Sequence, residues 1–428
     1  MAKKRYVLVG TGGRAELYYG AIARDFRDQA EITAFCDINR TRLAYANRLL
    51  QEKYAYPAVR TYHSSEFDRM IATEKPDFVI VTSIDRTHHR YIIRAMELGV
   101  DVISEKPMTV DEEKCQQILD TIKRTGRSLR VTFNYRYAPH NTKIRELIMN
   151  DTIGEVFSVH FEWLLNTKHG ADYFRRWHRD KRNSGGLLVH KATHHFDLVN
   201  FWLGTRPKTV YAQGDLRFYG RENAELRGVI DFYQRATGSE KAKGDPFALP
   251  LDQNETFREM YLLAEKDDGY QRDQSVFGDG ISIEDTMGVM VRYANKTILT
   301  YSLNAYMPWE GFNVAFNGSK GRIELKVVEQ AYVNAGGKKE DEGAVIGKRI
   351  TVFPQFAESY DVPIPEGIGG HGGGDAVLLN DLFGTPAADP FNRTASHIDG
   401  AMSILTGIAG NRSMRTGLPV DIDSLVKF

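Results

Sequence analysis

The stretch Arg5–Asp37, RYVLVGTGGRAELYYGAIARDFRDQAEITAFCD, decides the fold of the N-terminal part of the chain. Tyr6–Val9 is a short apolar run, typical of a buried parallel strand. It is followed directly by residues 10–15, GTGGRA, which form a G-x-G-x-x-A pattern ahead of a helical segment. In this pattern the first glycine allows a tight turn, the second lets backbone N–H groups approach a pyrophosphate, and the small last residue lets helix and strand pack. The positive end of the helix favours phosphates. We therefore expect a dinucleotide to be bound by Gly10, Gly12, Gly13 and Arg14.

A second apolar run, Ile32–Cys36, ends in Asp37, which comes 22 residues after Ala15. An acidic residue at this distance binds a ribose 2′-hydroxyl. Asp37 favours NAD over NADP, because a carboxylate repels a 2′-phosphate. Arg40 lies three residues further on and could accommodate that phosphate, so NADP stays open.

The bulk properties exclude several classes of function. A chain of 428 residues is long enough for two domains with sizeable cores. Its 56 basic and 56 acidic residues balance, so no footprint for nucleic acid or an anionic membrane is visible. No apolar run approaches the ~20 residues that span a bilayer, and no signal-peptide core follows the basic start. Cys36 and Cys115 provide no disulfide framework and are expected to be buried thiols. We expect a soluble cytoplasmic protein.

Strands and helices alternate in the first part of the chain. Further strands are predicted at residues 60–62, 78–82, 100–104 and 129–133, and helices at 40–50, 88–98 and 114–123. This alternation predicts an α/β domain over residues 1–134, with a doubly wound parallel sheet that binds its ligand at the carboxyl ends of the strands.

The pattern changes in residues 135–428. A helix is predicted at 141–149, and strands at 155–164, 209–213, 287–293, 297–303 and 312–316. Helices are sparse among these strands, which predicts an α+β domain with a large, mostly antiparallel sheet for substrate binding and oligomerisation. The polar segment 234–278 is interpreted as a solvated surface insertion in preference to a lid, and 334–343 as a similar loop. Asp375 is expected to be the N-cap of a helix at 376–383, and a helix at 396–413 could pack back on the first domain.

Glu105-Lys106-Pro107 follows a predicted strand at the edge where a parallel sheet presents its functional ends. A lysine there can donate to a substrate hydroxyl and stabilise the oxyanion as hydride leaves, and burial would adjust its pKa. Proline restricts the turn after the strand. A surface lysine in a salt bridge is the alternative, but this position favours a catalytic Lys106.

A histidine-rich stretch, residues 185–197, reads GGLLVHKATHHFD. If it is helical, His190, His194 and Asp197 share one face, where a histidine can accept a proton and a carboxylate one turn away can orient it. Metal binding is an alternative, because two histidines four residues apart resemble half of a zinc site. However, Lys191 stands where H-E-x-x-H has its glutamate. We predict no metal; a purely structural histidine cluster is the remaining alternative.

Trp177-His178-Arg179 lies in the basic segment 174–182. An aromatic ring beside an arginine suits stacking on a sugar or cofactor, so Trp177 and Arg179 are candidates for cofactor binding. An exposed basic loop is an equal alternative.

Together these motifs resemble the Gfo/Idh/MocA oxidoreductases, named for glucose–fructose oxidoreductase and inositol dehydrogenase, over nearly the whole chain. Residues 83–88 are similar to the family's T-P-N-x-x-H turn, with Ile84 and Asp85 substituted, and Glu105-Lys106-Pro107 is the family's hallmark. Residues 134–136, NYR, and 153–156, IGEV, resemble its domain junction.

The resemblance implies a Rossmann domain, an open-faced mixed sheet that carries the interface of a homodimer or homotetramer, and tightly held NAD(P). By the family's D-x-x-x-H-x-x-D pattern, Lys106 and His194 carry over as the catalytic pair and Asp197 as the downstream acid. We expect the cofactor site to include also Ser83, Asp85, His88, Glu105, Lys106 and Asn134, and the substrate site to comprise Lys106, Tyr135, His190, Lys191 and His194.

One departure from the pattern concerns the substrate. The usual first aspartate is His190 here, followed by Lys191, so neutral or positive groups replace a negative one. Such a pocket suits an acidic sugar or uses His190 as a second acid–base group. We expect an NAD-dependent oxidoreductase acting on a secondary hydroxyl of a sugar, cyclitol or glycoside. The alternatives are a glycoside hydrolase or lyase that oxidises its substrate transiently, and a non-catalytic sugar or dinucleotide sensor.

Overall fold

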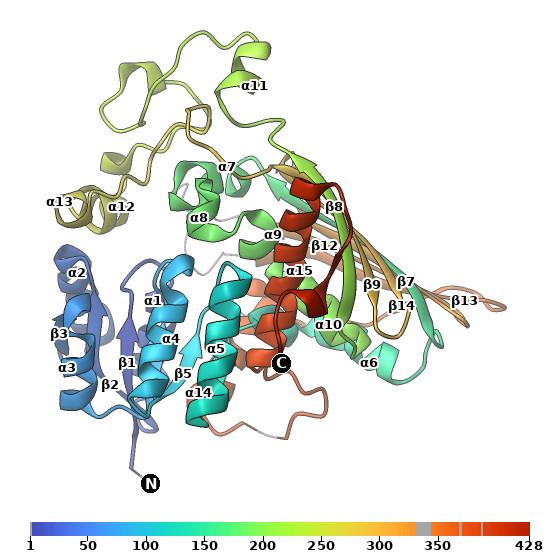
Figure 1. Cartoon of the computed structure of the whole chain (residues 1–428), viewed down its shortest axis with the longest axis horizontal. Helices are drawn as coiled ribbons and strands as arrows, with labels where there is room; N and C mark the ends of the chain where they lie inside the picture. Colours follow the sequence, from blue (N-terminus) through green and yellow to red (C-terminus); the bar gives the residue numbers. More distant parts are fainter. Residues whose placement is uncertain (1, 331–343, 368–369, 387) are drawn as a thin grey trace.

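Six parallel strands form the sheet of the N-terminal domain, in the order β3-β2-β1-β4-β5-β6 (Figure 1). The computed structural model describes residues 2–330, 344–367, 370–386 and 388–428; the loop expected at 334–343 lies outside them. The strands are β1 (Lys4–Val9), β2 (Ala30–Asp37), β3 (Arg60–His63), β4 (Phe78–Val81), β5 (Asp101–Ser104) and β6 (Leu129–Val131). The helices are α1 (Ala15–Arg24), α2 (Arg40–Tyr54), α3 (Phe67–Glu74), α4 (His88–Glu97) and α5 (Glu112–Thr125). The predicted doubly wound parallel sheet is confirmed.

Local chemistry explains where two of these helices begin and end. The side chain of Asn39 accepts a hydrogen bond from the backbone of Arg42 at 2.9 Å and so caps α2, and Asp111 does the same for α5. Gly126 ends α5 in the left-handed region, with φ of +65°. The fully buried ends of β1 and β4 fit a sheet covered on both faces. All carboxyl ends therefore lie at one edge.

A nine-stranded sheet dominates the C-terminal domain, in the order β14-β13-β12-β11-β7-β10-β9-β8-β15. Its pairs are antiparallel except β7 with β10, so the predicted mostly antiparallel sheet is confirmed. The strands are β7 (Val156–Asn166), β8 (Pro207–Asp215), β9 (Thr286–Tyr293), β10 (Ile298–Met307), β11 (Glu310–Gly318), β12 (Gly321–Gln330), β13 (Ala344–Pro354), β14 (Tyr360–Val362) and β15 (Val420–Asp421). The helices are α6 (Pro139–Met149), α7 (His169–Arg175), α8 (Lys181–Ser184), α9 (Leu187–His190), α10 (Thr193–Leu203), α11 (Arg221–Leu226), α12 (Glu255–Phe257), α13 (Glu265–Asp268), α14 (Gly374–Phe383) and α15 (His397–Thr416).

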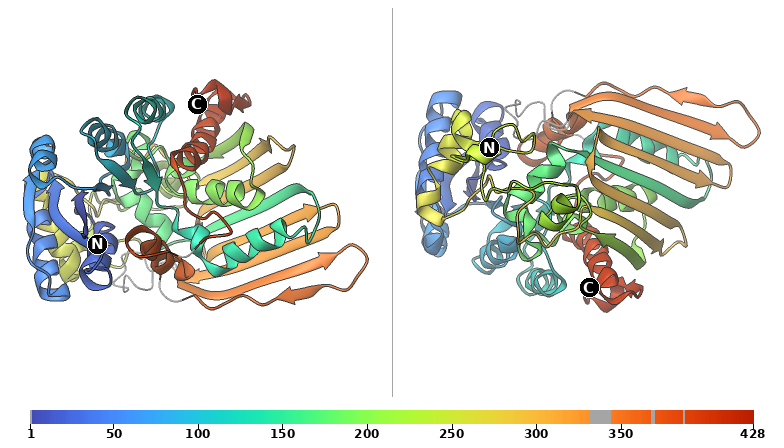
Figure 2. Two further views of the ribbon diagram at one scale, coloured as in Figure 1. Left: turned by 90° about the horizontal axis from the view of Figure 1, so that it is seen from below. Right: turned by 90° about the horizontal axis from the view of Figure 1, so that it is seen from above.

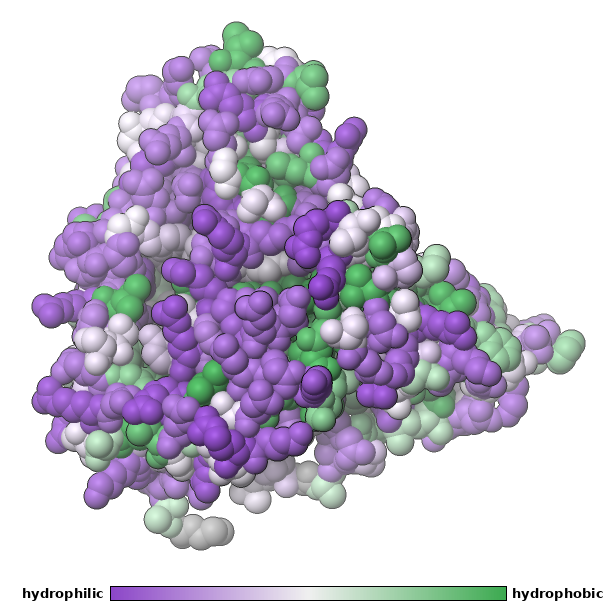
Figure 3. All heavy atoms as spheres, in the orientation of Figure 1, coloured by the Kyte–Doolittle hydropathy of each residue, from purple (hydrophilic) through white to green (hydrophobic). Residues whose placement is uncertain are grey.

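The two faces of this large sheet differ. Helices α6, α10 and α15 lie on one face, while the figures show no described helix on the other (Figures 1 and 2). In β9 every second side chain from Met287 to Tyr293 is buried and the intervening ones are exposed, as one-sided packing requires. The view of Figure 3 is mostly hydrophilic, with scattered apolar groups.

The two domains are joined by more than one segment. Helix α15 begins after Ser396, whose hydroxyl caps it, and a Cβ on Gly400 would lie 2.7 Å from Val131 of β6. In α14 the expected N-cap is wrong: Gly373 precedes the helix and Asp375 lies inside its first turn. Its carboxylate instead accepts a hydrogen bond of 2.6 Å from Asn134, because that side chain lies at the domain junction.

The segment 234–278 is not solvated throughout. Leu251, Phe257, Met260 and Ala264 are buried in it, and the views from two sides place α12 and α13 beside α2 (Figures 1 and 2). The interpretation as a solvated insertion is therefore wrong for residues 249–273, because these residues pack between the domains.

Cys36 and Cys115 are free and buried, as predicted. Of the helices that the structure describes, none combines the length and the apolar character that a bilayer crossing requires.

Candidate active site

The glycine loop between β1 and α1 is shaped for close approach of a ligand. Gly10 has a φ of +91°, and a Cβ there would lie 2.5 Å from the backbone nitrogen of Ser83, so a side chain is excluded. A Cβ on Gly12 would meet nothing within 4 Å, which leaves open space beside the backbone. This cradle at the start of α1 fits the pyrophosphate of a dinucleotide.

Asp37 ends β2 beside this loop. Its carboxylate accepts hydrogen bonds from the Thr11 backbone at 2.6 Å, the Thr11 hydroxyl at 3.0 Å and the Asn39 backbone at 2.8 Å. Each carboxylate oxygen has two lone pairs, so these bonds orient Asp37 and leave capacity for a ribose hydroxyl. Arg40 is exposed at the start of α2.

Glu105 connects the glycine loop to the end of β5. Its Oε1 accepts from Arg14 Nε at 2.6 Å and from the Tyr18 hydroxyl at 2.6 Å. Burial alone would raise the pKa of this carboxyl, but the Arg14 guanidinium and the Lys106 ammonium hold the pKa of Glu105 below its usual range. Glu105 is therefore a buried anion that organises the surrounding cations.

Lys106 follows Glu105 and is partly buried. Burial lowers the pKa of Lys106 from 10.5 to about 8, although Glu105 and Asp85 act in the opposite direction. A lysine whose charge changes near neutral pH, at the carboxyl edge of a parallel sheet, can both donate to an alkoxide and exchange a proton.

His190 meets Asp85 of the other domain. The two side chains are joined by a hydrogen bond of 2.5 Å between His190 Nδ1 and Asp85 Oδ2. Burial, reinforced by the charges of Lys106 and Arg176, lowers the pKa of His190 well below its usual range. Burial raises the pKa of Asp85 well above its usual range, so burial disfavours the charged form of both partners.

The expected single helical face does not form. His190 is the last residue of α9, and α10 begins only at Thr193, so His190 and His194 lie on different helices. Asp197 does not orient a histidine: its carboxylate accepts from Arg136 at 2.7 and 2.5 Å. The helical pattern of the sequence continues across α9 and α10, so it did not indicate that the helix is interrupted after His190.

His178 joins this cluster. Its ring lies 4.2 Å from that of His190, and metal-ligand atoms of Asp85, His178 and His190 lie within 4.8 Å of one another. The Lys106 and Arg176 charges that lower the pKa of His190 would also repel a divalent cation. We therefore interpret the cluster as acid–base machinery. The sequence analysis named Trp177 and Arg179 as candidates but not His178 between them. The proximity of His178 to Asp85, which belongs to the other domain, cannot be recognised from the sequence.

Lys191 lies among aromatic rings on the inner side of the large sheet. Its Nζ is 4.7 Å from the centre of the Trp163 ring and 5.7 Å from that of Tyr135. Only 5% of the residue is exposed, and no hydrogen bond or ion pair joins it to another described residue. A nearby acid, Glu310, is already bonded to His169 at 2.5 Å. Lys191 is thus a buried cation suited to an anionic ligand.

Three further predicted residues, His194, Asn134 and His88, have different surroundings in the structure. His194 packs edge-on to Tyr135, with ring centres 4.7 Å apart, and so lies near Lys191. Asn134 Oδ1 is buried without a hydrogen-bond partner among the described residues, as a ligand-binding amide would be. The ring of His88 lies 2.8 Å from the Pro107 carbonyl and 2.9 Å from that of Ser83, and so joins the two turns.

The side chains of Trp177 and Arg179 contact different parts of the structure. The Trp177 ring stacks on His178, with centres 3.6 Å apart, and therefore supports the histidine cluster. The Arg179 guanidinium donates to the Asp279 carbonyl at 2.8 Å and the Ser275 carbonyl at 3.2 Å. This corrects the assignment of Arg179 to the cofactor, because its donors are committed to the insertion.

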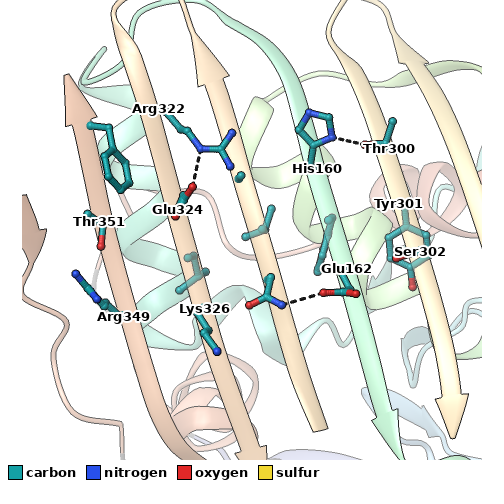
Figure 4. A pocket seen from close by; sticks show the side chains of 16 residues that line it. His160, Glu162, Thr300, Tyr301, Ser302, Arg322, Glu324, Lys326, Arg349 and Thr351 are labelled. Carbon is teal, nitrogen blue, oxygen red and sulfur yellow. Dashed lines mark hydrogen bonds and ion pairs between the residues drawn. The ribbon is translucent and has the colours of Figure 1, made fainter. Parts of the chain in front are cut away.

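A separate depression lies on the open face of the large sheet, where side chains of β7, β10, β12 and β13 point outward (Figure 4). It is lined by charged and polar residues such as Glu162, Arg322, Glu324 and Lys326. None of the predicted catalytic residues lines it, so it is not the active site.

The comparisons with known proteins agree with this architecture. Two family models match: the oxidoreductase family, NAD-binding Rossmann fold, over residues 4–133, and the oxidoreductase family, C-terminal alpha/beta domain, over residues 145–422. The chain belongs to the Gfo/Idh/MocA oxidoreductase family.

Individual relatives cover the chain to different extents. YteT of Bacillus subtilis (strain 168) is 34% identical, with 99% of each chain covered. D-glucoside 3-dehydrogenase of Escherichia coli (strain K12) is 28% identical over 47% of this chain and 54% of that protein. The crystal structure of the WlbA dehydrogenase from Bordetella pertussis, in complex with NADH and UDP-GlcNAcA, has a TM-score of 0.64 at 19% identity. It covers 98% of this chain and 99% of that chain, and it supports the fold alone.

Proposed function

We propose that this protein is an NAD-dependent dehydrogenase that acts on a secondary hydroxyl of an acidic sugar or sugar derivative. The observation that carries the proposal is Lys106: a partly buried lysine with a pKa lowered to about 8, at the end of β5, electrostatically coupled to Asp85 and adjacent to Glu105. The family membership and the D-glucoside 3-dehydrogenase relative support the reaction class.

The proposed chemistry divides between a lysine and a histidine. The nicotinamide of a bound dinucleotide supplies a hydride acceptor. The Lys106 ammonium donates to the substrate oxygen and stabilises negative charge that develops there. His190 accepts the hydroxyl proton, and Asp85 orients the His190 ring. The resemblance to the family assigns the role of proton acceptor to His194 instead. The 2.5 Å hydrogen bond between Asp85 and His190, and the closeness of His190 to Lys106, favour the Asp85–His190 pair.

Lys191 supports the acidic substrate. A cation over aromatic rings gains about 0.5–2 kcal/mol, less than the several kcal/mol that burying an ammonium costs. A substrate carboxylate would provide the missing partner, and the nearby Lys106 and Arg176 add positive potential. Neutral sugars would leave Lys191 without this ion pair.

The test is a substrate panel with the purified protein. NAD⁺ or NADP⁺ is mixed with uronic and aldonic acids, the matching neutral sugars, cyclitols and aryl glycosides, while reduced nicotinamide and freed aglycone are followed together. Reduced cofactor that accumulates with an acid but not with its neutral partner is the expected result. Accumulation with neutral sugars alone would refute the acidic class. Freed aglycone without net reduction would replace the dehydrogenase with redox-assisted glycoside cleavage, and dinucleotide binding without turnover across the panel would favour a sensor.

We also propose that the open face of the large sheet pairs with a second copy of the chain. Tyr211, Met290, Ile298 and Phe353 are exposed on this face, at 39%, 52%, 46% and 37%. Glu162, Arg322, Glu324 and Lys326 line the depression on the same face, so acidic and basic groups of two copies can pair across a two-fold axis.

A further inference from the structure

Residues 249–273, here named the docking segment, bind the N-terminal half of α2. Asn39 Nδ2 donates to the Ala264 carbonyl at 2.8 Å, and the Thr41 backbone donates to Asp267 at 2.7 Å. Arg42 forms an ion pair with Asp268, and both side chains are almost buried, at 11% and 8% exposure. These contacts join residues more than 220 positions apart, so the segment is held to the dinucleotide domain at specific points.

The docking segment also lies over the glycine loop. A Cβ added to Gly13 would lie 3.3 Å from the Tyr261 hydroxyl. On its other side the segment is tied to the second domain, because Arg272 is buried against Tyr261 and forms an ion pair with Asp172 at 3.1 Å. The segment therefore extends from the phosphate-binding loop to the start of α2, along the outer side of the expected dinucleotide site.

The charges at this contact bear on the choice of dinucleotide. Because Asp37 is placed to bind a ribose 2′-hydroxyl, a 2′-phosphate would face the residues that follow β2, at the start of α2. Three groups there suit a phosphate: the Arg40 guanidinium, the Thr41 backbone N–H and the Arg42 guanidinium. Arg40 is exposed, whereas the Thr41 N–H and the Arg42 guanidinium are already bonded to the carboxylates of Asp267 and Asp268. The Thr41 bond is the largest contribution to the lowered pKa of Asp267, which keeps that group ionised.

We propose that the docking segment forms the outer wall of the dinucleotide site and that Asp267 and Asp268 select NAD over NADP. The two carboxylates occupy two of the three donors that suit a 2′-phosphate, leaving Arg40, and their negative charges repel the phosphate. This inference rests on the proposed function only in that a dinucleotide binds; it does not depend on the sugar or on turnover.

The experiment measures binding of NAD⁺ and NADP⁺ to the dinucleotide-free, full-length protein by titration calorimetry. The variant D267S/D268S removes both carboxylates. The matched control D252S/E255S removes two exposed acids of the same segment that form no hydrogen bond or ion pair with the described part of α2. Thermal unfolding checks that each variant folds, and D267N/D268N, which retains the shape of both side chains, replaces the serine variant if it does not.

The wild-type protein should bind NAD⁺ at least about tenfold more tightly than NADP⁺, since one charge-assisted hydrogen bond is worth roughly that factor. D267S/D268S should tighten NADP⁺ by about tenfold or more and change NAD⁺ less than about threefold, whereas the control should change neither. A wild-type preference for NADP⁺, or an NADP⁺ affinity that D267S/D268S does not alter, overturns the inference and leaves the dehydrogenase proposal intact. Failure of the wild type to bind either dinucleotide overturns both.

Discussion

Replacing Lys106 by methionine should inactivate the protein and stabilise it. Methionine preserves the length of the apolar stem and removes the ammonium. The pKa of Lys106 is lowered from 10.5 to about 8, a difference that corresponds to about 3 kcal/mol of unfavourable free energy for the buried charge. Because the side chain is partly exposed, water reduces this cost, and we expect K106M to gain about 1–3 kcal/mol in free energy of unfolding at pH 7.

The pH dependence follows from the same values. Below pH 8 the lysine is charged in both the folded and the unfolded chain, so the wild type bears the full cost. Between about pH 8 and pH 10.5 only the unfolded chain retains the proton, so wild-type stability rises with pH and the advantage of K106M shrinks. Activity has the opposite trend: wild-type kcat/KM should fall above about pH 8, as the ammonium that stabilises the alkoxide is lost.

Urea denaturation of the dinucleotide-free protein at pH 7 and pH 10 measures the stability difference, and initial rates measure turnover. Loss of a single donor to a developing oxyanion predicts a decrease in kcat of about 10²–10³-fold for K106M. Lys123 is exposed on α5, so K123M is the matched control and should leave both quantities near wild type. A K106M variant that is less stable at pH 7, or a stability gain that does not change with pH, would refute the reasoning.

The remaining predictions concern the substrate, the proton path and the assembly. K191M should raise KM for an acidic substrate by about 10–100-fold in rate assays, since a charged hydrogen bond is lost; an unchanged KM would remove Lys191 from the acid-binding site. D85N restores the asparagine of the family motif and should lower kcat by about 10²-fold, because His190 loses the carboxylate that orients it. A near-normal kcat would instead favour His194 as the proton acceptor. M290E should shift the molar mass in light scattering toward the monomer, whereas L226E, on exposed α11, should not; a monomeric wild type would refute the paired sheets.

The sequence supported the fold well because its signals are local. The glycine loop, the buried run before it and the acid 22 residues later lie within one strand–helix–strand unit, so periodicity and spacing suffice to recognise it. Lys106 could be identified in the same way, because the carboxyl end of a parallel strand is a predictable position.

The interpretations that failed depended on partners far along the chain. Arg179 looked suited to a cofactor until its carbonyl partners, about 100 residues away, were placed beside it. Asp375 was expected to cap a helix, because the sequence does not reveal its hydrogen bond to Asn134, a residue far away along the chain. The insertion looked solvated because its charged residues meet opposite charges on α2, and composition cannot distinguish an acid paired with arginine from one in water.

By itself, the sequence determined the dinucleotide-binding fold and the position of Lys106 at the end of a parallel strand, since these depend on residues close together along the chain. Only the tertiary structure decided that Asp85 and His190 form a hydrogen bond, that Lys191 is buried with no ion pair to a described residue, and that Asp267 and Asp268 face α2. The reason is physical. A pKa and an ion pair depend on the charges and burial around a group, and those are set by segments that the fold brings together from both domains.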